Sequence, residues 1–291
     1  MRQILKLEIY KALRTKTFFI SIGIGIIISV LQTNWFYNNF FVENYRLLEE
    51  YMNLTNDDPH YFNVWFETGV LQGWLGCEYA SVYNELFFLI MPLLAVLPYG
   101  GALYMEWNKG YSAQILIRCD RKKYFTAKMI AVFVSGGIAI SIPLIFNFIV
   151  SACYLPMIGV DPLSMQAIVA NRDMWAVLYF DYPALYVLAY TILDFVFGGL
   201  MACMALVVTH FFDNVFAVMI FPLLVNCLLY YGLDTVDSAT RKYNMSFIVN
   251  PSQGGGGNEI LAVMTTVFMS IFITILLYFM ANRKRDVIKE R

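Results

Sequence analysis

Charged side chains are scarce in this sequence. They make up 14% of its 291 residues, whereas soluble globular domains carry about 25%. This deficit excludes an ordinary soluble domain. The apolar residues, 59% of the chain, gather into runs long enough to cross a hydrocarbon layer about 30 Å thick as helices. Because these runs do not alternate with a period of two, they predict a helical membrane protein and not a β-barrel.

The motifs of several enzyme classes are also missing. No GxxxxGK[ST] motif is present, so the chain has no ATP-binding loop of its own. Neither of its two histidines, His60 and His210, belongs to an HExxH pair or another metal-ligand spacing. The five cysteines fit neither a disulfide framework nor a metal site. We therefore expect no enzymatic activity, no metal and no cofactor in this chain, and no nucleic-acid partner.

The apolar runs predict an all-α membrane protein with six transmembrane helices. Their approximate ranges are 17–36, 86–105, 129–155, 183–212, 216–233 and 260–282. Together they form one transmembrane domain over 17–282, preceded by the segment 1–16 and followed by a basic tail over 283–291. The first span is expected to remain as an anchor, because no small-x-small cleavage site follows Leu31.

Basic residues are distributed unevenly along the chain. The segment 1–16 holds five, the segment 106–128 holds six and the tail over 283–291 holds five, which is sixteen of the twenty in total. The connections between these segments are rich in acidic residues instead. By the positive-inside rule, both termini and the segment 106–128 are cytoplasmic. Six spans satisfy this arrangement, since an even number places both ends on one side.

The connections carry structure of their own. Apolar residues recur among the charges of 1–16, which predicts an amphipathic helix at the cytoplasmic lipid surface, although a charged flank that orients the first span explains the pattern as well. The outer connection over 37–85 is too long for a plain loop. We expect it to form a partly ordered cap, with an amphipathic helix over 38–54 and with Trp65 and Trp74 at the outer interface. The four glycines over 254–257 are either a hinge or a loop without a role.

The segment 106–128 is predicted to be a hairpin that carries a short helix on the inner membrane surface. Gly110 ends the preceding helix, and the short helix over 111–118 is followed by a turn at Asp120. Its mixture of apolar and basic side chains suits docking in a protein groove with an acidic rim. The predicted docking residues are Glu106, Gly110, Tyr111, Ile115, Leu116, Arg118, Arg121 and Lys122.

Three polar residues lie inside the predicted spans. Asp194 is the one acid well within a span, where a carboxylate costs a few kcal/mol, so it is expected to face other helices, water or a partner. A substrate or proton path explains it, and so does a protonated packing residue. Asn147 and Asn226 are candidates for the same path, although hydrogen bonds between helices explain them equally well.

Two pairs of small residues have the four-residue spacing that lets helix backbones approach closely. They are Gly25 with Ser29 and Gly198 with Ala202. The spacing predicts helix contacts, either within one bundle or across a dimer.

The sequence resembles the membrane subunits of ABC-2 type transporters. The resemblance lies in the basic stretch LEIYKALRTKTFF that leads into the first span, in the long outer connection, and in EWNKGYSAQILIRCDRKKYFTAKMIA after the second span. The positions that match the family are Glu106, Gly110, Leu116, Arg121 and Lys128. The stretch from Arg118 to Asp120 stands where the family's turn usually has a proline.

This resemblance implies a type V exporter-like permease that pairs with a second membrane subunit, identical or different. Each permease is then seated on a separate cytoplasmic ABC ATPase, which binds the ATP and Mg, and 106–128 is the coupling hairpin. The implied activity is export of a hydrophobic or amphipathic substrate, such as an antimicrobial peptide, a drug or a lipid, across a bacterial cytoplasmic membrane. A non-transporting scaffold and an intramembrane enzyme are the alternatives, and the enzyme would need more buried acids than Asp194.

Overall fold

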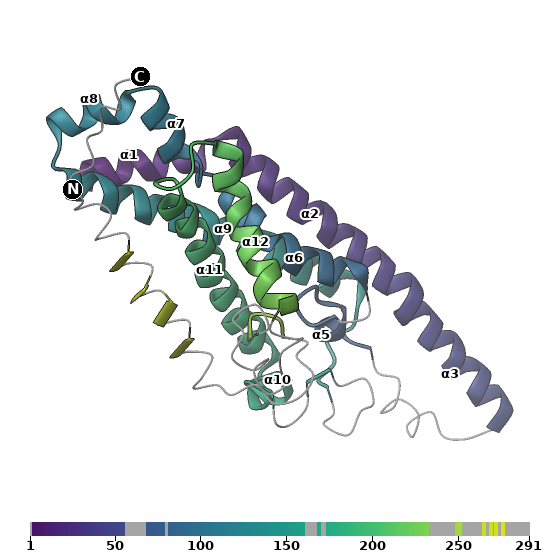
Figure 1. Cartoon of the computed structure of the whole chain (residues 1–291). Coiled ribbons are helices and arrows are strands. Elements are labelled where there is room, and N and C mark those ends of the chain that lie inside the picture. The colour runs from purple at the N-terminus through teal and green to yellow at the C-terminus, as the bar shows by residue number, and fades with distance from the viewer. Residues whose placement is uncertain are drawn as a thin grey trace.

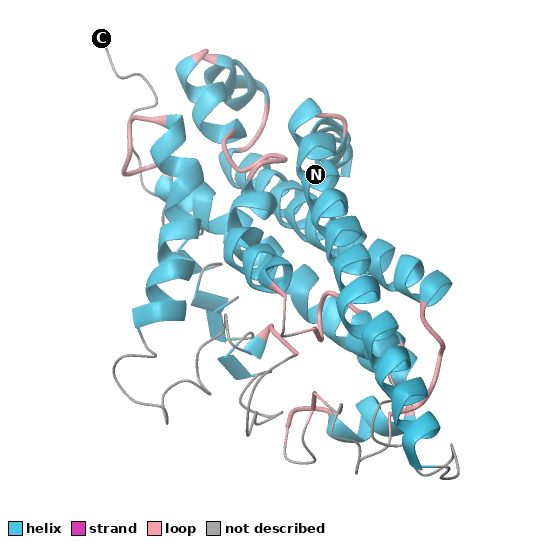
Figure 2. Cartoon of the chain, turned by 90° about the vertical axis from the view of Figure 1, so that its right-hand side faces the viewer, coloured by secondary structure: helices cyan, strands magenta, loops and turns pink. Residues whose placement is uncertain are grey.

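The computed structural model is a bundle of helices (Figures 1 and 2). It describes residues 2–55, 68–78, 81–160, 168–169, 173–232 and 248–251, and four residue pairs at 264–265, 268–269, 271–272 and 275–276. Within these residues the regular secondary structure is helical and no strand occurs. The prediction of an all-α chain is confirmed for this part of the sequence.

Among the described residues, three helices are long and apolar enough to cross a membrane. The first, α2 (Lys16–Phe36), has 21 residues and continues through a π-helical turn, η1 (Tyr37–Phe41), into α3 (Val42–Thr55). The other two are α9 (Arg121–Tyr154) and α11 (Pro183–Val208). At 1.5 Å per residue, α2 alone is about 30 Å long, the thickness of a hydrocarbon layer.

The rod formed by α2, η1 and α3 extends well past the other helices (Figure 1). Its 40 residues span about 60 Å, twice what one crossing requires. The segment 38–54, predicted as an amphipathic helix, is helical throughout, but its first four residues belong to η1 and the rest to α3. The aromatic side chains at the junction stack along the rod. Ring centroids of Phe36 and Phe40 lie 5.3 Å apart, and those of Tyr37 and Phe41 lie 5.4 Å apart. These stacks hold the π-helical turn in place.

The helix predicted over 86–105 is not continuous, which corrects the second predicted span. Helix α6 (Val82–Val96) ends before a turn over 97–101, and α7 (Ala102–Asn108) follows. Leu97 still has helical dihedral angles, but Pro98 cannot donate a backbone hydrogen bond. Gly100 and Gly101, which disfavour a helix, follow after Tyr99. At 15 residues, α6 is shorter than the three long helices.

The remaining helices follow the predicted order. Helix α8 (Tyr111–Arg118) has the predicted bounds, α10 (Ala176–Asp181) precedes α11, and α12 (Val215–Gly232) matches the fifth predicted span. The residue pairs over 264–276 are helical where described, but most of the sixth predicted span, the glycines over 254–257 and the tail over 283–291 lie outside the described residues.

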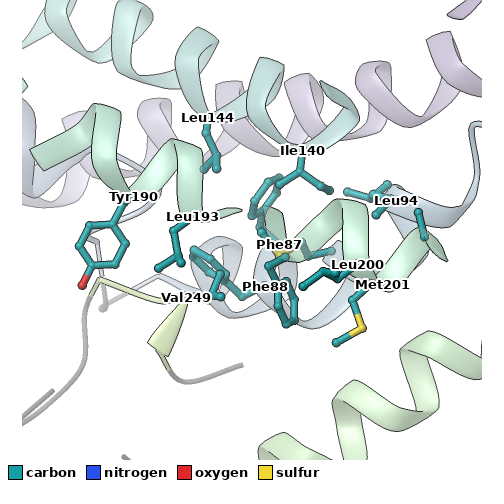
Figure 3. Close-up of a cluster of buried hydrophobic side chains, with 14 of the residues drawn as sticks. Phe87, Phe88, Leu94, Ile140, Leu144, Tyr190, Leu193, Leu200, Met201 and Val249 are labelled. Atoms are coloured by element: carbon teal, nitrogen blue, oxygen red, sulfur yellow. The ribbon is translucent and has the colours of Figure 1, made fainter. Parts of the chain in front are cut away.

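The most extensive contact between described helices joins α9 to α11. A Cβ built on Gly136 would lie 2.6 Å from Cβ of Ala202 and 3.3 Å from the carbonyl oxygen of Gly198, so the backbones touch where side chains are absent. On α2, Gly25 packs against the ring of Pro143, and the Ser29 hydroxyl donates to the Pro143 carbonyl at 3.1 Å. Both small-residue pairs therefore pack within the chain. Phe87 and Phe88 of α6 fill the core beside these helices (Figure 3).

The segment 68–78, which contains the short helix α5 (Val70–Gly73), is buried along its whole length between α2 and α9. Irregular backbone is tolerated inside a membrane bundle only where protein groups or water satisfy its polar atoms. Here Trp74 donates its indole N–H to the carbonyl of Leu144 at 3.1 Å, and Gln32 donates to the carbonyl of Gly73 at 3.1 Å. Of the two tryptophans predicted at the outer membrane interface, Trp74 faces protein instead, because its side chain is fully buried in the bundle. Trp65 lies outside the described residues.

Candidate functional site

Helices α1 (Arg2–Leu13), α7 and α8 gather at one end of the bundle, which we call the α8 end (Figure 1). Two local features of the sequence, Gly110 and Asp120, position α8 at this end. Gly110 adopts a φ of 67°, a left-handed conformation that glycine accepts without strain, and this reverses the chain between α7 and α8. The Asp120 side chain then accepts the backbone N–H of Lys122 at 3.3 Å and caps α9.

Helix α8 has an outward face and an inward face. Tyr111, Gln114, Ile117 and Arg118 are exposed and share the outward face, since their spacing is three to four residues. Ile117 is 85% exposed, the largest fraction of any apolar side chain on this helix. On the inward face, Ile115 and Leu116 pack against the core.

Behind α8 lies a group of charged and tyrosine side chains from α1, α7, α8, α9 and the turn over 97–101, buried at its centre and exposed at its edge on Tyr111. We call it the ion cluster. Its members are Glu8, Lys11, Tyr99, Glu106, Tyr111, Tyr124 and Lys128.

Lys128 is the centre of the ion cluster. Its Nζ lies 2.7 Å from Oε2 of Glu8 and 2.7 Å from Oε1 of Glu106, and it donates to the Tyr99 hydroxyl at 3.2 Å. The same Nζ lies 4.7 Å from the centroid of the Tyr99 ring. Lys128 is fully buried, so its charge is matched by two carboxylates and by aromatic faces in place of water.

The second ammonium group connects the cluster to α8. Lys11 lies 3.3 Å from Oε1 of Glu8 and donates to the hydroxyl of Tyr111 at 3.2 Å. Tyr124 donates its hydroxyl hydrogen to Glu106. Two carboxylates and two ammonium groups thus neutralise one another, and they bind α1, α7, α8 and α9 into one unit.

Proximity to the lysines controls ionisation at this site. Burial opposes a charge on Glu8, but the attraction of Lys128 and Lys11 and the hydrogen bonds from Lys128 and Tyr99 outweigh it and lower the pKa of the carboxyl. Burial likewise opposes a charge on Lys11, but the hydrogen bond to Tyr111 and the two carboxylates raise its pKa. Burial raises the pKa of Tyr99, and so do Glu8 and Glu106, so Tyr99 keeps its hydroxyl hydrogen as a donor.

Helix α1 is also fastened by its C-terminal end. The hydroxyls of Thr15 and Thr17 both donate to the carbonyl of Pro98, at 3.0 Å and 3.1 Å. Thr15 in addition caps α2 by accepting the N–H of Phe18. The segment 1–16 is helical over Arg2–Leu13, with Glu8 and Ala12 buried against the bundle. Its predicted place at the cytoplasmic lipid surface stays a prediction.

The predicted docking residues occupy different environments. Tyr111, Arg118 and Lys122 are exposed, whereas Glu106 and Arg121 are partly buried. The guanidinium of Arg121 lies 5.7 Å from the ring centroid of Phe125. Some of the predicted docking residues are therefore exposed and available to a partner, whereas others pack beneath them and support α8.

Asn147 and Asn226, two of the residues proposed for an intramembrane path, have their hydrogen-bond partners elsewhere than in the hairpin over 106–128. Asn147 accepts the N–H of Leu75 at 2.6 Å and donates to Gln32 at 2.9 Å and to Thr33 at 3.1 Å, so it holds the segment 68–78 in place. Asn226 of α12 donates to the carbonyl of Phe88 at 3.4 Å. Both make the interhelical hydrogen bonds that the sequence allowed. Asp194, the third of these residues, is completely buried in α11.

Sequence reasoning missed Glu8, Lys11, Tyr99, Tyr124 and Ile117 as site residues. Glu8 had a detectable signal, because it is the one acid in the basic segment 1–16. Tyr99 had none, since its role depends on the turn over 97–101. Ile117 belongs to the predicted helix, but its exposure depends on which face packs inward.

Within the described residues, no three His, Cys, Asp or Glu side chains are grouped as a metal site requires. Comparison with protein-family models, with curated proteins and with solved structures gives no match.

Proposed function

We propose that this chain is the membrane-spanning permease of an ATP-driven ABC exporter in a bacterial cytoplasmic membrane. The observation that carries the proposal is the outward face of α8, an exposed apolar and basic surface on a short helix. This helix packs on the core through Ile115 and Leu116 and accepts a hydrogen bond from Lys11 at Tyr111. Exposed apolar side chains beside charges are typical of docking surfaces. A cytoplasmic ABC ATPase is the partner that the resemblance to ABC-2 permeases implies.

In this proposal α8 receives force when the ATPase closes on ATP and Mg. The inward face of α8 and Tyr111 pass the displacement to the ion cluster, which is shared by α1 and α9. Since α9 packs along α2 and α11, a shift of its basic end changes the packing of the three long helices. Discrete rearrangement is expected because packed helices deform little.

The transported substrate is a hydrophobic or amphipathic molecule, such as an antimicrobial peptide, a drug or a lipid, and it moves outward between this permease and a second one. The second permease is either another copy of this chain or a different subunit. The charge distribution supports the sidedness, since the α8 end carries the basic segments 1–16 and 106–128.

Affinity purification from the native host tests the proposal. The full chain should retain a nucleotide-hydrolysing subunit, detected as release of phosphate from ATP. Ile117→Asp should abolish this co-purification, because it places a charge in the centre of the docking face, and Ile117→Leu should preserve it. Phosphate release that is equal for Ile117→Asp and wild type would refute the docking role, and its absence from the wild type would favour a scaffold.

A further inference from the structure

A second group of side chains at the α8 end combines a guanidinium with three rings. Trp107 comes from α7, Arg121 and Phe125 come from the first turns of α9, and His210 comes from the turn that follows α11. The ring centroids of Trp107 and His210 lie 4.7 Å apart, and each lies 6.4 Å from that of Phe125. The three rings are therefore in mutual contact. We call these four residues the Arg121 cluster.

The positive charge of Arg121 is not matched by a carboxylate. Its guanidinium carbon lies 5.7 Å from the centroid of the Phe125 ring. Among the described residues Arg121 forms no ion pair, because the two carboxylates of the ion cluster pair with the lysines there. The side chain of Asp120, its neighbour in sequence, accepts the backbone N–H of Lys122 instead. Arg121 thus offers an uncompensated charge to a ligand.

Two N–H groups of the Arg121 cluster are covered and have no hydrogen-bond partner among the described residues. They are the indole N–H of Trp107 and the Nε–H of Arg121. A buried donor without an acceptor is unfavourable, so these two groups favour binding of an acceptor from outside. The terminal nitrogens of Arg121 are not covered in this way, and both side chains are only partly buried. An acceptor at the surface therefore reaches Arg121 first.

The surroundings of the cluster match a membrane interface. Phe211 and Phe212 follow the cluster directly in sequence and are 73% and 40% exposed. Lys122 and Lys123, at the start of α9, are exposed as well. Apolar and basic side chains lie together in this way where acyl chains meet the phosphates of a lipid layer. The distribution of basic residues predicts that this layer is the cytoplasmic leaflet.

We propose that the Arg121 cluster binds the phosphate group of an anionic phospholipid. The planar guanidinium of Arg121 matches two phosphate oxygens, and the nearby lysines favour a headgroup with a net negative charge. A change in the Arg121 rotamer uncovers the indole N–H of Trp107, which donates to the same phosphate. The acyl chains lie against Phe211 and Phe212. This site needs only the described helices and a membrane, so it does not depend on docking of an ATPase.

Lipid retention by the purified full chain tests the site. Wild type extracted in mild detergent should carry phosphatidylglycerol or cardiolipin, detected by native mass spectrometry of the intact protein. Arg121→Gln should lower the bound fraction several-fold, and Trp107→Phe, which removes the N–H but keeps a ring, should lower it less. Arg118→Gln, which removes a charge from the outward face of α8, should match the wild type. Equal retention in Arg121→Gln and wild type would overturn the proposal.

Titration of the delipidated full chain identifies the ligand and controls for misfolding. The probes are dihexanoyl phosphatidylglycerol, dihexanoyl phosphatidylcholine and inorganic phosphate, and the readout is the midpoint of thermal unfolding in detergent. Phosphatidylglycerol should raise the midpoint of the wild type by a few degrees and that of Arg121→Gln by much less, while both proteins unfold cooperatively without ligand. An equal rise with inorganic phosphate would indicate a site for free anions, and an equal rise with phosphatidylcholine would exclude a preference for anionic lipid. Either result contradicts the proposal.

Discussion

At the scale of single residues, the energetics of the α8 end depend on Lys128. Removing one partner of a buried ion pair leaves the others without compensation, which typically costs about 3–5 kcal/mol. Lys128→Met should therefore lower the free energy of unfolding by this amount, measured by thermal or denaturant unfolding in detergent. Lys123→Met, at an exposed position of the same helix, should stay within about 0.5 kcal/mol of the wild type. Equal stability of the two variants would contradict the importance of the ion cluster.

The lowered pKa of Glu8 gives the same end of the molecule a pH dependence. Because the folded protein holds the carboxylate more strongly than the unfolded chain, its stabilising contribution is complete above the ordinary value of 4.5 and is lost as the pH falls through the lowered pKa. Between about pH 7 and about pH 3, unfolding midpoints of Glu8→Gln should fall less than those of the wild type. Glu49→Gln, at an exposed position of α3, should follow the wild type. Parallel profiles for Glu8→Gln and wild type would count against the assignment.

At the scale of helices, two glycines of α2 form a natural pair of variant and control. A Cβ on Gly25 would collide with the rigid ring of Pro143, whereas a Cβ on Gly23 would meet nothing within 4 Å. Gly25→Ala should destabilise the protein by about 1–3 kcal/mol through overpacking. Gly23→Ala should be neutral or stabilising by up to about 1 kcal/mol. Unfolding of both variants in the same detergent decides whether α2 packs on α9 as described.

The helices of this chain could be predicted mainly where one local signal decides the outcome. The apolar runs located α2, α9, α11 and α12 to within a few residues at most ends, although α9 starts earlier because Asp120 caps it. The run over 86–105 was wrongly predicted to be one continuous helix, because its apolar composition was given more weight than the break that Pro98 introduces. The burial of the segment 68–78 had no local signal at all, since Gln32 and Asn147, which satisfy its backbone, are distant in the sequence.

At the scale of the whole molecule, the candidate site exists only when the helices at the α8 end are packed together. The sequence identified the hairpin and Glu106, but the ion cluster draws on α1, α7, α8, α9 and a turn, and its parts are up to 120 residues apart. Amphipathic spacing predicts which residues share a face but not which face packs inward. For this reason Ile115 and Leu116, predicted as docking residues, support α8 from beneath, while Ile117 is exposed.

The sidedness of the two ends tests the central claim most directly. In a chain whose five native cysteines are replaced by serine, single cysteines at Ile117 on α8 and at Glu50 on α3 report the two ends. An impermeant maleimide added to intact cells should modify Glu50→Cys, and should modify Ile117→Cys only after the membrane is made permeable. Modification of Ile117→Cys in intact cells would contradict a cytoplasmic α8 and, with it, docking of an ATPase.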